Sequence, residues 1–106
     1  MDIINLTVHD ITIIKNEKTE IIPPSGVVAR CETQEVLIGK VNGVDVYKIN
    51  YGNVTGLPPA NKNTVYVTSA LVAQAVKQIR NDVLIPNDFV RDKKGVIIGC
   101  KSLAQL

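Results

Sequence analysis

The chain has 106 residues, of which 45% are apolar, with a net charge of +2 and a single histidine. This length suits one domain spanning residues 1–106, and no apolar run approaches the roughly 20 residues that a membrane-spanning helix needs. The weak positive charge and the four aromatic side chains are not typical of a protein that binds long nucleic acids.

The two cysteines, Cys31 and Cys100, are far apart and belong to no Cys-x-x-Cys motif. Together with one histidine they cannot complete a zinc cluster, so neither a metal ion nor another cofactor is expected. The N-terminus lacks the basic region and apolar stretch of a secretory signal. We therefore expect a cytoplasmic protein with two buried, reduced thiols, whereas a disulfide between them would require a secreted chain.

The N-terminal segment predicts two strands, because residues 3–8 and 11–15 are rich in apolar and β-branched side chains. Alternation in the first strand places Asn5, Thr7 and His9 on one face. This polar row either binds a polar ligand through hydrogen bonds or forms the solvated face of an edge strand. His9 is also a candidate general base, although we favour a histidine bonded to the backbone at a strand end.

Two hairpins are predicted next. The polar residues 15–18 close the first over residues 10–22, and the stretch Pro-Pro-Ser-Gly ends it. Asn42-Gly43 is typical of a type I′ turn, in which both central residues have positive φ, and it predicts a hairpin over residues 35–50. The expected cross-strand pairs are Lys40 with Asp45, Ile38 with Tyr47, and Val36 with Ile49.

The pattern changes after a predicted loop over residues 51–63, which is rich in glycine, proline and asparagine. Residues 64–67 predict a short strand, and residues 69–79 an amphipathic helix with Ser69 as its N-cap. An extended run follows, so that residues 64–86 could cross over between two parallel strands. Ser69 would then lie where a strand ends and a helix begins, a position that can bind an anion.

The C-terminal residues 89–103 predict a final hairpin around the turn Asp92-Lys93-Lys94-Gly95. Together these elements predict a strand-rich α+β domain built from β-hairpins, with one helix over residues 69–79 packed on the sheet.

Three arginines are candidates for binding a phosphate or a carboxylate. Arg30 lies among apolar residues, so it either extends its charged end into solvent or holds an anion with two hydrogen bonds. Arg80 and Arg91, with Asn87 between them, belong to a stretch that either forms local salt bridges and turn caps or holds a ligand. Because no nucleophile motif and no phosphate-binding loop occurs, we expect a protein that binds without catalysing a reaction.

Five stretches follow one another along nearly the whole chain: NLTVH, PPSGVVAR, YGNVTGLP, VYVTSALVAQAV and NDVLIPND…VRD…G. In this order they resemble a family of small phage and bacterial proteins, mostly uncharacterised, whose typical form begins Asn-Leu-Thr-Pro-His. The chain departs from that form at Val8, where the family has proline, and it is shorter between Asp82 and Arg91. Small phage proteins of this kind include anti-defence sponges, which bind nucleotide immune signals such as cyclic ADP-ribose variants and cyclic oligonucleotides without cleaving them.

The resemblance therefore implies a homo-oligomeric, non-enzymatic protein that sequesters a nucleotide-like signal in the host cytoplasm. The implied ligand contacts are Arg30, Arg80 and Arg91 to phosphates, and Asn5, Thr7, Ser69 and Asn87 to ribose or base edges, with His9 completing the candidate set. The alternative is a structural or protein-interaction module of a phage or mobile element, since exposed hairpin edges pair readily with other chains. A hydrolase that uses His9 is a third hypothesis.

Overall fold

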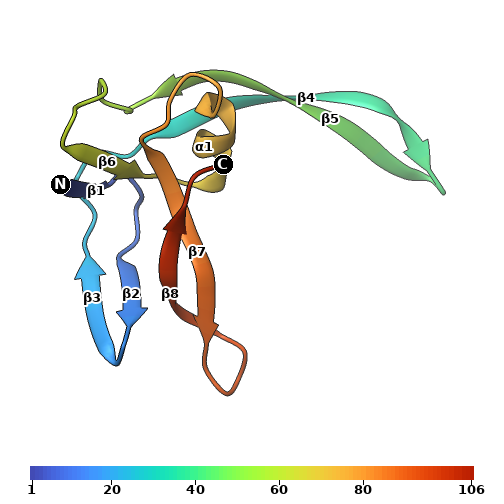
Figure 1. Cartoon of the computed structure of the whole chain (residues 1–106). Coiled ribbons are helices and arrows are strands. Elements are labelled where there is room, and N and C mark those ends of the chain that lie inside the picture. The colour runs from blue at the N-terminus through green and yellow to red at the C-terminus, as the bar shows by residue number, and fades with distance from the viewer.

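The computed structural model describes residues 1–106 and is a small, mostly β domain with one short helix (Figure 1). This agrees with the strand-rich part of the expected α+β class. The elements are β1 (Asp2–Asn5), β2 (Ile11–Lys15), β3 (Lys18–Ile22), β4 (Arg30–Val41), β5 (Val44–Thr55), β6 (Thr64–Val67), α1 (Ala70–Val76), β7 (Val83–Arg91) and β8 (Ile97–Ala104).

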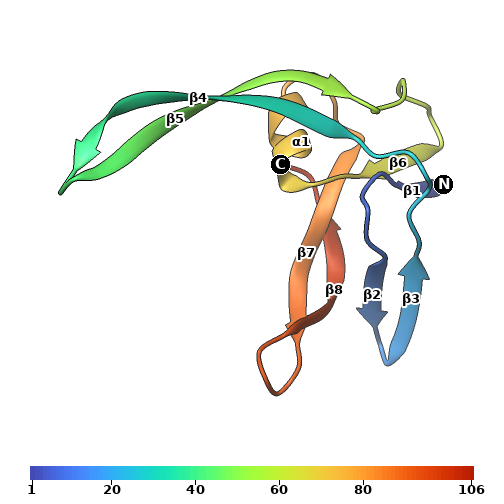
Figure 2. The same ribbon diagram turned by 180° about the vertical axis from the view of Figure 1, so that it is seen from behind.

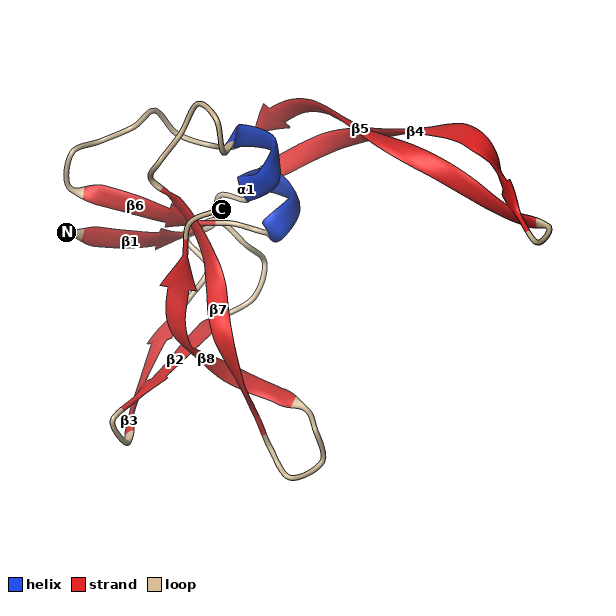
Figure 3. Cartoon of the chain, turned by 45° about the vertical axis from the view of Figure 1, so that its right-hand side comes forward, coloured by secondary structure: helices blue, strands red, loops and turns tan.

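Six strands form one mixed sheet in the order β1-β6-β7-β8-β2-β3 (Figure 3). β6 lies between β1 and β7 and runs parallel to both, so the predicted crossover over residues 64–86 is confirmed. The predicted hairpins over residues 10–22 and 89–103 are also confirmed, as β2–β3 and β7–β8. These two hairpins meet through a single parallel bridge between Ile13 and Cys100.

The helix α1 begins as predicted, with the Ser69 hydroxyl accepting a hydrogen bond from the Val72 N–H at 3.4 Å. Its buried face packs against β7 and the bases of β4 and β5. The helix ends at Val76, three residues earlier than predicted, and Ile79, the last residue of the predicted helix, is 79% exposed. The last turn tightens there, because the Ile79 N–H donates to the Val76 carbonyl three residues back.

The core is small and divided. Only 13 of the 106 residues are buried, which is few for a chain that must offset its conformational entropy by burying apolar surface. Cys100 is buried as expected, whereas Cys31 is only partly buried, and both thiols are free. The three buried apolar clusters are Leu6, Ala29, Tyr66 and Val72; Ile11, Val67 and Cys100; and Ala73, Val76 and Val83.

The remaining strands, β4 and β5, pair only with each other and project away from the rest of the chain, as views from both sides show (Figures 1 and 2). We call this hairpin, residues 30–55, the arm. Its turn has positive φ at Asn42 and Gly43, as predicted, but each strand has twelve residues. The predicted loop over residues 51–63 is therefore wrong for residues 51–55, which continue β5.

The register of the arm agrees with the prediction only beside the turn. Lys40 pairs with Asp45, and their side chains lie 3.6 Å apart. Beyond them Ile38 is an extra residue in a β-bulge, so the pairing shifts by one position. The predicted pairs of Ile38 with Tyr47 and of Val36 with Ile49 are therefore wrong; the observed pairs are Leu37 with Tyr47, Val36 with Lys48, and Glu35 with Ile49.

Candidate functional site

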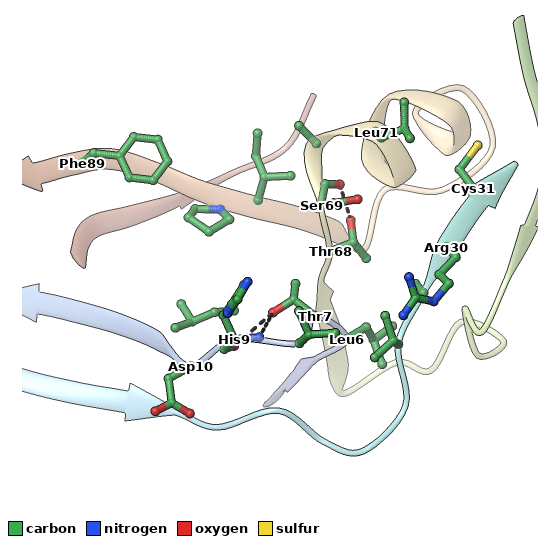
Figure 4. Close-up of a pocket in the computed structure, with 17 residues that line it drawn as sticks. Leu6, Thr7, His9, Asp10, Arg30, Cys31, Thr68, Ser69, Leu71 and Phe89 are labelled. Carbon is green, nitrogen blue, oxygen red and sulfur yellow. Dashed lines mark hydrogen bonds between the residues drawn. The ribbon is translucent and has the colours of Figure 1, made fainter. Parts of the chain in front are cut away.

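A groove of about 630 Å³ opens where four segments meet (Figure 4). These segments are the β1–β2 connection, the start of β4, the junction of β6 with α1, and the middle of β7. Leu6 and Ile11 are buried beneath it, while Leu71 and Phe89 are partly exposed at its walls. The groove is therefore mostly apolar, which is usual for a small-molecule site.

Asn5 does not belong to a polar face, because β1 ends at this residue and the chain bends away. Its side chain is only 1% exposed, and its amide has a full set of partners. Nδ2 donates to the carbonyls of His9 at 2.7 Å and Ile22 at 3.0 Å, and Oδ1 accepts from the N–H and the hydroxyl of Thr7 at 2.9 and 2.7 Å. The predicted strand over residues 3–8 is therefore confirmed only for residues 3–5, and the alternating polar row is wrong; Asn5 instead holds the groove-forming loop to the sheet.

Thr7 and His9 both line the groove, at the loop that Asn5 holds. The Thr7 hydroxyl is already engaged within the loop, next to the Asn5 oxygen and the His9 carbonyl. The hydrogen bonds of His9 involve only its backbone, so its exposed imidazole is free to bind a ligand.

Arg30 and Ser69 also line the groove, and Figure 4 shows Arg30 at the opposite end from His9, with Thr7 between them. The two ion pairs of the chain lie elsewhere, so the exposed Arg30 guanidinium has no carboxylate partner. Ser69 accepts the helix-capping bond through its oxygen, which leaves its proton available to a ligand. Neighbouring Thr68 is fully buried and donates to the Ser69 carbonyl at 2.9 Å.

Arg80 lies outside the groove and has a structural role. Its guanidinium makes two hydrogen bonds to Asp82, at 2.8 and 2.9 Å, and a third to the Pro58 carbonyl at 2.9 Å. The hydrogen bonds from Arg80 lower the pKa of Asp82, and those to Asp82 raise the pKa of Arg80. The local salt bridge considered for this stretch is thus confirmed for Arg80 and Asp82, and it ties the loop after the arm to the start of β7.

Asn87 and Arg91 also lie on β7 outside the groove lining. Asn87 donates to the Ser102 hydroxyl at 3.0 Å across the β7–β8 pair, and Arg91 donates to the Gly95 carbonyl at 2.8 Å. The structure therefore brings together four of the eight predicted site residues, Thr7, His9, Arg30 and Ser69.

Two apolar residues of the groove were missed by sequence reasoning. Phe89, the only phenylalanine, is 52% exposed and presents a ring on the β7 side of the groove. Leu71 lies in the first turn of the helix, where helical periodicity places it with the apolar residues, and it is 38% exposed at the groove wall. Phe89 belongs to the stretch for which a ligand-holding role was one of the two alternatives, but the chain forms the strand β7 there and not a loop.

Nowhere in the chain do three histidine, cysteine, aspartate or glutamate side chains converge as metal ligands would. The single helix, with seven residues, is also far too short to cross a membrane. A comparison with protein-family models, with curated proteins and with solved structures finds no match for this chain.

Proposed function

We propose that the chain binds a small anionic ligand of nucleotide type in this groove and does not transform it. The observation that carries the proposal is the unpaired Arg30 guanidinium at one end of a mostly apolar groove. A guanidinium with free donors binds phosphate through two parallel hydrogen bonds, while apolar walls suit a base or ribose.

The other free groups of the groove support the same ligand class. The His9 imidazole lies at the far end from Arg30, and the Ser69 hydroxyl lies across from Thr7 (Figure 4). Phe89 offers a ring on which a base could stack. A volume of about 630 Å³ falls within the usual range for small-molecule sites, about 300–1,000 Å³.

Within this proposal, the biological role is that of a phage anti-defence sponge, working in the host cytoplasm on a nucleotide-derived immune signal. Sequestration needs affinity and no catalytic group, and it agrees with a groove in which no carboxylate bonds to the His9 imidazole. Asp10 points away from Ser69 and Arg30, so it leaves the charge near the arginine positive (Figure 4).

Isothermal titration calorimetry with ADP-ribose, cyclic ADP-ribose and a cyclic dinucleotide tests the proposal directly. We expect at least one of them to bind the wild-type chain, and the substitution Arg30→Gln to weaken that binding by about tenfold or more. The matched control is Arg91→Gln, which removes the same charge from an arginine outside the groove. Absence of heat with all three nucleotides, or equal losses in the two variants, would argue against this site.

Native mass spectrometry of the protein purified from cells complements the titration. A bound mass of a few hundred daltons that is lost in the Arg30→Gln variant would identify the natural ligand. A bound mass that persists in that variant would place the ligand elsewhere.

The second candidate function, a structural or protein-interaction module of a phage or mobile element, is favoured by the arm. A two-stranded hairpin that projects from the body exposes both of its backbone edges to other chains. Purification of a different protein in fixed stoichiometry, together with no nucleotide binding, would favour this function over the sponge.

A further inference from the structure

The arm exposes a large apolar surface to water, which is unfavourable for an isolated two-stranded hairpin. A hairpin without a third strand or a covering element is marginal at best. Yet eight large apolar side chains of the arm are between 42% and 66% exposed. They are Val36, Leu37, Ile38, Val41, Val44, Tyr47, Ile49 and Tyr51.

One face of the arm carries a continuous apolar row. Tyr47, Ile49 and Tyr51 are alternate residues of β5, so their side chains share a face. Across the hairpin, Leu37 pairs with Tyr47 on the same face. We call these four residues the arm row; Glu35, the partner of Ile49, forms a polar margin beside it.

The arm row lies on the same side of the arm as the residues that pack against the core near the body. Cys31 lies an even number of residues from Leu37 on β4, and the register shift between Cys31 and Thr33 adds its extra residue to β5, so the two side chains point to the same side. Cys31 and its partner Val54 pack against the buried cluster of Leu6 and Val72. This side of the arm is therefore covered by the buried cluster near the body. Toward the turn of the arm, no part of the chain covers it.

The solvent-accessible surface of the chain is larger than that of a compact monomer, which supports a partner that covers part of it. A folded monomer of this mass exposes about 5,800 Å², whereas this chain exposes 7583 Å². The radius of gyration is 16.3 Å, against about 13 Å for a compact domain of this length. The four side chains of the arm row leave on the order of 100 Å² each, about half of the roughly 800 Å² that one partner contributes to a standard interface, so the backbone and polar margin of the arm must supply the rest.

We infer that the arm row binds the arm row of a second copy of this chain, so that two arms pack face to face in a homodimer. Such packing buries the aromatic and aliphatic side chains of both rows between two sheets, as in a β-sandwich. The second copy thereby supplies the core that the outer part of each arm lacks.

Two features of the arm favour a second copy over a different protein. The sequence Tyr47, Ile49, Tyr51 reads aromatic, aliphatic, aromatic from either end, so a twofold axis at its centre places Ile49 against its own symmetry mate. The arm also carries three cations and three anions, so two arms meet without net repulsion, while the rest of the chain has the whole net charge of +2.

Analytical ultracentrifugation of the full chain between about 1 and 100 µM tests the interface. We expect the wild-type chain to be a dimer, and Ile49→Glu to raise the dimer dissociation constant by about 100-fold or more, since it places two charges at the axis. The matched control is Val36→Glu, because Val36 is exposed on the opposite face, across from Lys48. This variant should remain dimeric.

A wild-type chain that stays monomeric overturns the inference and leaves the arm row to a different protein. An Ile49→Glu chain that stays dimeric, or a Val36→Glu chain that dissociates equally, places the interface elsewhere and also overturns it. Circular dichroism of each variant confirms that the chain is folded.

Cross-linking provides a second readout should the charged variant fail to fold. In a Cys31→Ser background, Ile49→Cys should form an intermolecular disulfide under mild oxidation, and Val36→Cys should not. The reverse result contradicts face-to-face packing at the arm row. Because neither experiment involves a nucleotide, the inference stands or fails independently of the proposed ligand.

Discussion

The amide of Asn5 is expected to be indispensable, and the substitution Asn5→Asp tests this with almost no change of shape. Nδ2 of Asn5 donates to the carbonyls of His9 and Ile22 from a side chain that is 1% exposed. An aspartate in its place would point an oxygen at both carbonyls. It would therefore lose two hydrogen bonds and place an unpaired charge in a buried position.

The expected cost at neutral pH is about 3–5 kcal/mol, because two buried carbonyls lose their donors and the carboxylate is desolvated. For a domain of this length, this lowers the melting temperature by roughly 15 °C or more. The substitution also introduces a pH dependence. Burial and the two facing carbonyls raise the folded-state pKa of the new carboxyl above its unfolded value of about 3.9. The penalty is therefore smallest below about pH 4, where the carboxyl is protonated in both states, and it grows as pH rises through the folded pKa.

Urea unfolding at a fixed protein concentration, followed by circular dichroism at pH 4 and pH 7.5, measures both effects. The control is Asn87→Asp, since Asn87 is exposed and its partner, the Ser102 hydroxyl, can donate to a carboxylate instead of accepting from an amide. That variant should lie within about 1 kcal/mol of the wild type. An Asn5→Asp chain as stable as this control at pH 7.5 would refute the role assigned to Asn5.

Two further predictions concern the loop that follows the arm. Gly56 has a φ of +79°, and a Cβ there would lie 2.2 Å from the Val28 carbonyl oxygen, so Gly56→Ala should cost about 3 kcal/mol or more in urea unfolding. Gly26→Ala, with a φ of +97° but open space, should cost only about 1–2 kcal/mol, and equal losses would contradict the steric argument. Arg80 lowers the pKa of Asp82, so this pair stabilises the fold above about pH 4 and less as pH falls through the folded pKa. Asp82→Asn should cost about 2 kcal/mol at pH 7 and reduce the acid-induced loss of stability, whereas acid profiles of equal slope would show that the pair does not contribute.

Half of the predicted site residues come together in the groove. The residues that were placed correctly and those that were not differ in whether neighbouring residues or distant ones decide their contacts. Ser69 was placed correctly because a helix cap depends on residues close in the sequence. Arg80 and Arg91 were indistinguishable from Arg30 as cations, and only the fold shows which of them has a partner. Asp82 and the Pro58 carbonyl engage Arg80, the Gly95 carbonyl engages Arg91, and Arg30 has no carboxylate partner.

Asn5 shows most directly which contacts an alternating strand pattern cannot predict. Its place beside Thr7 and His9 in an apolar segment is typical of a solvated strand face. Its actual partners include the carbonyl of Ile22, seventeen residues away, and that contact exists only once folding brings the end of β3 next to Asn5. A buried polar residue satisfied by distant backbone groups has no periodic signature in the sequence.

The sequence by itself determined the local elements: the turn at Asn42-Gly43, the hairpins over residues 10–22 and 89–103, and the strand–helix–strand unit over residues 64–86. Each depends on backbone preferences and periodicity within a few residues. The tertiary structure decided the rest, including the one-residue shift at Ile38, the groove that joins four separate segments, and the projecting arm. These features depend on which surfaces meet in space, since an apolar side chain alternates in the same way whether a core covers it or water does.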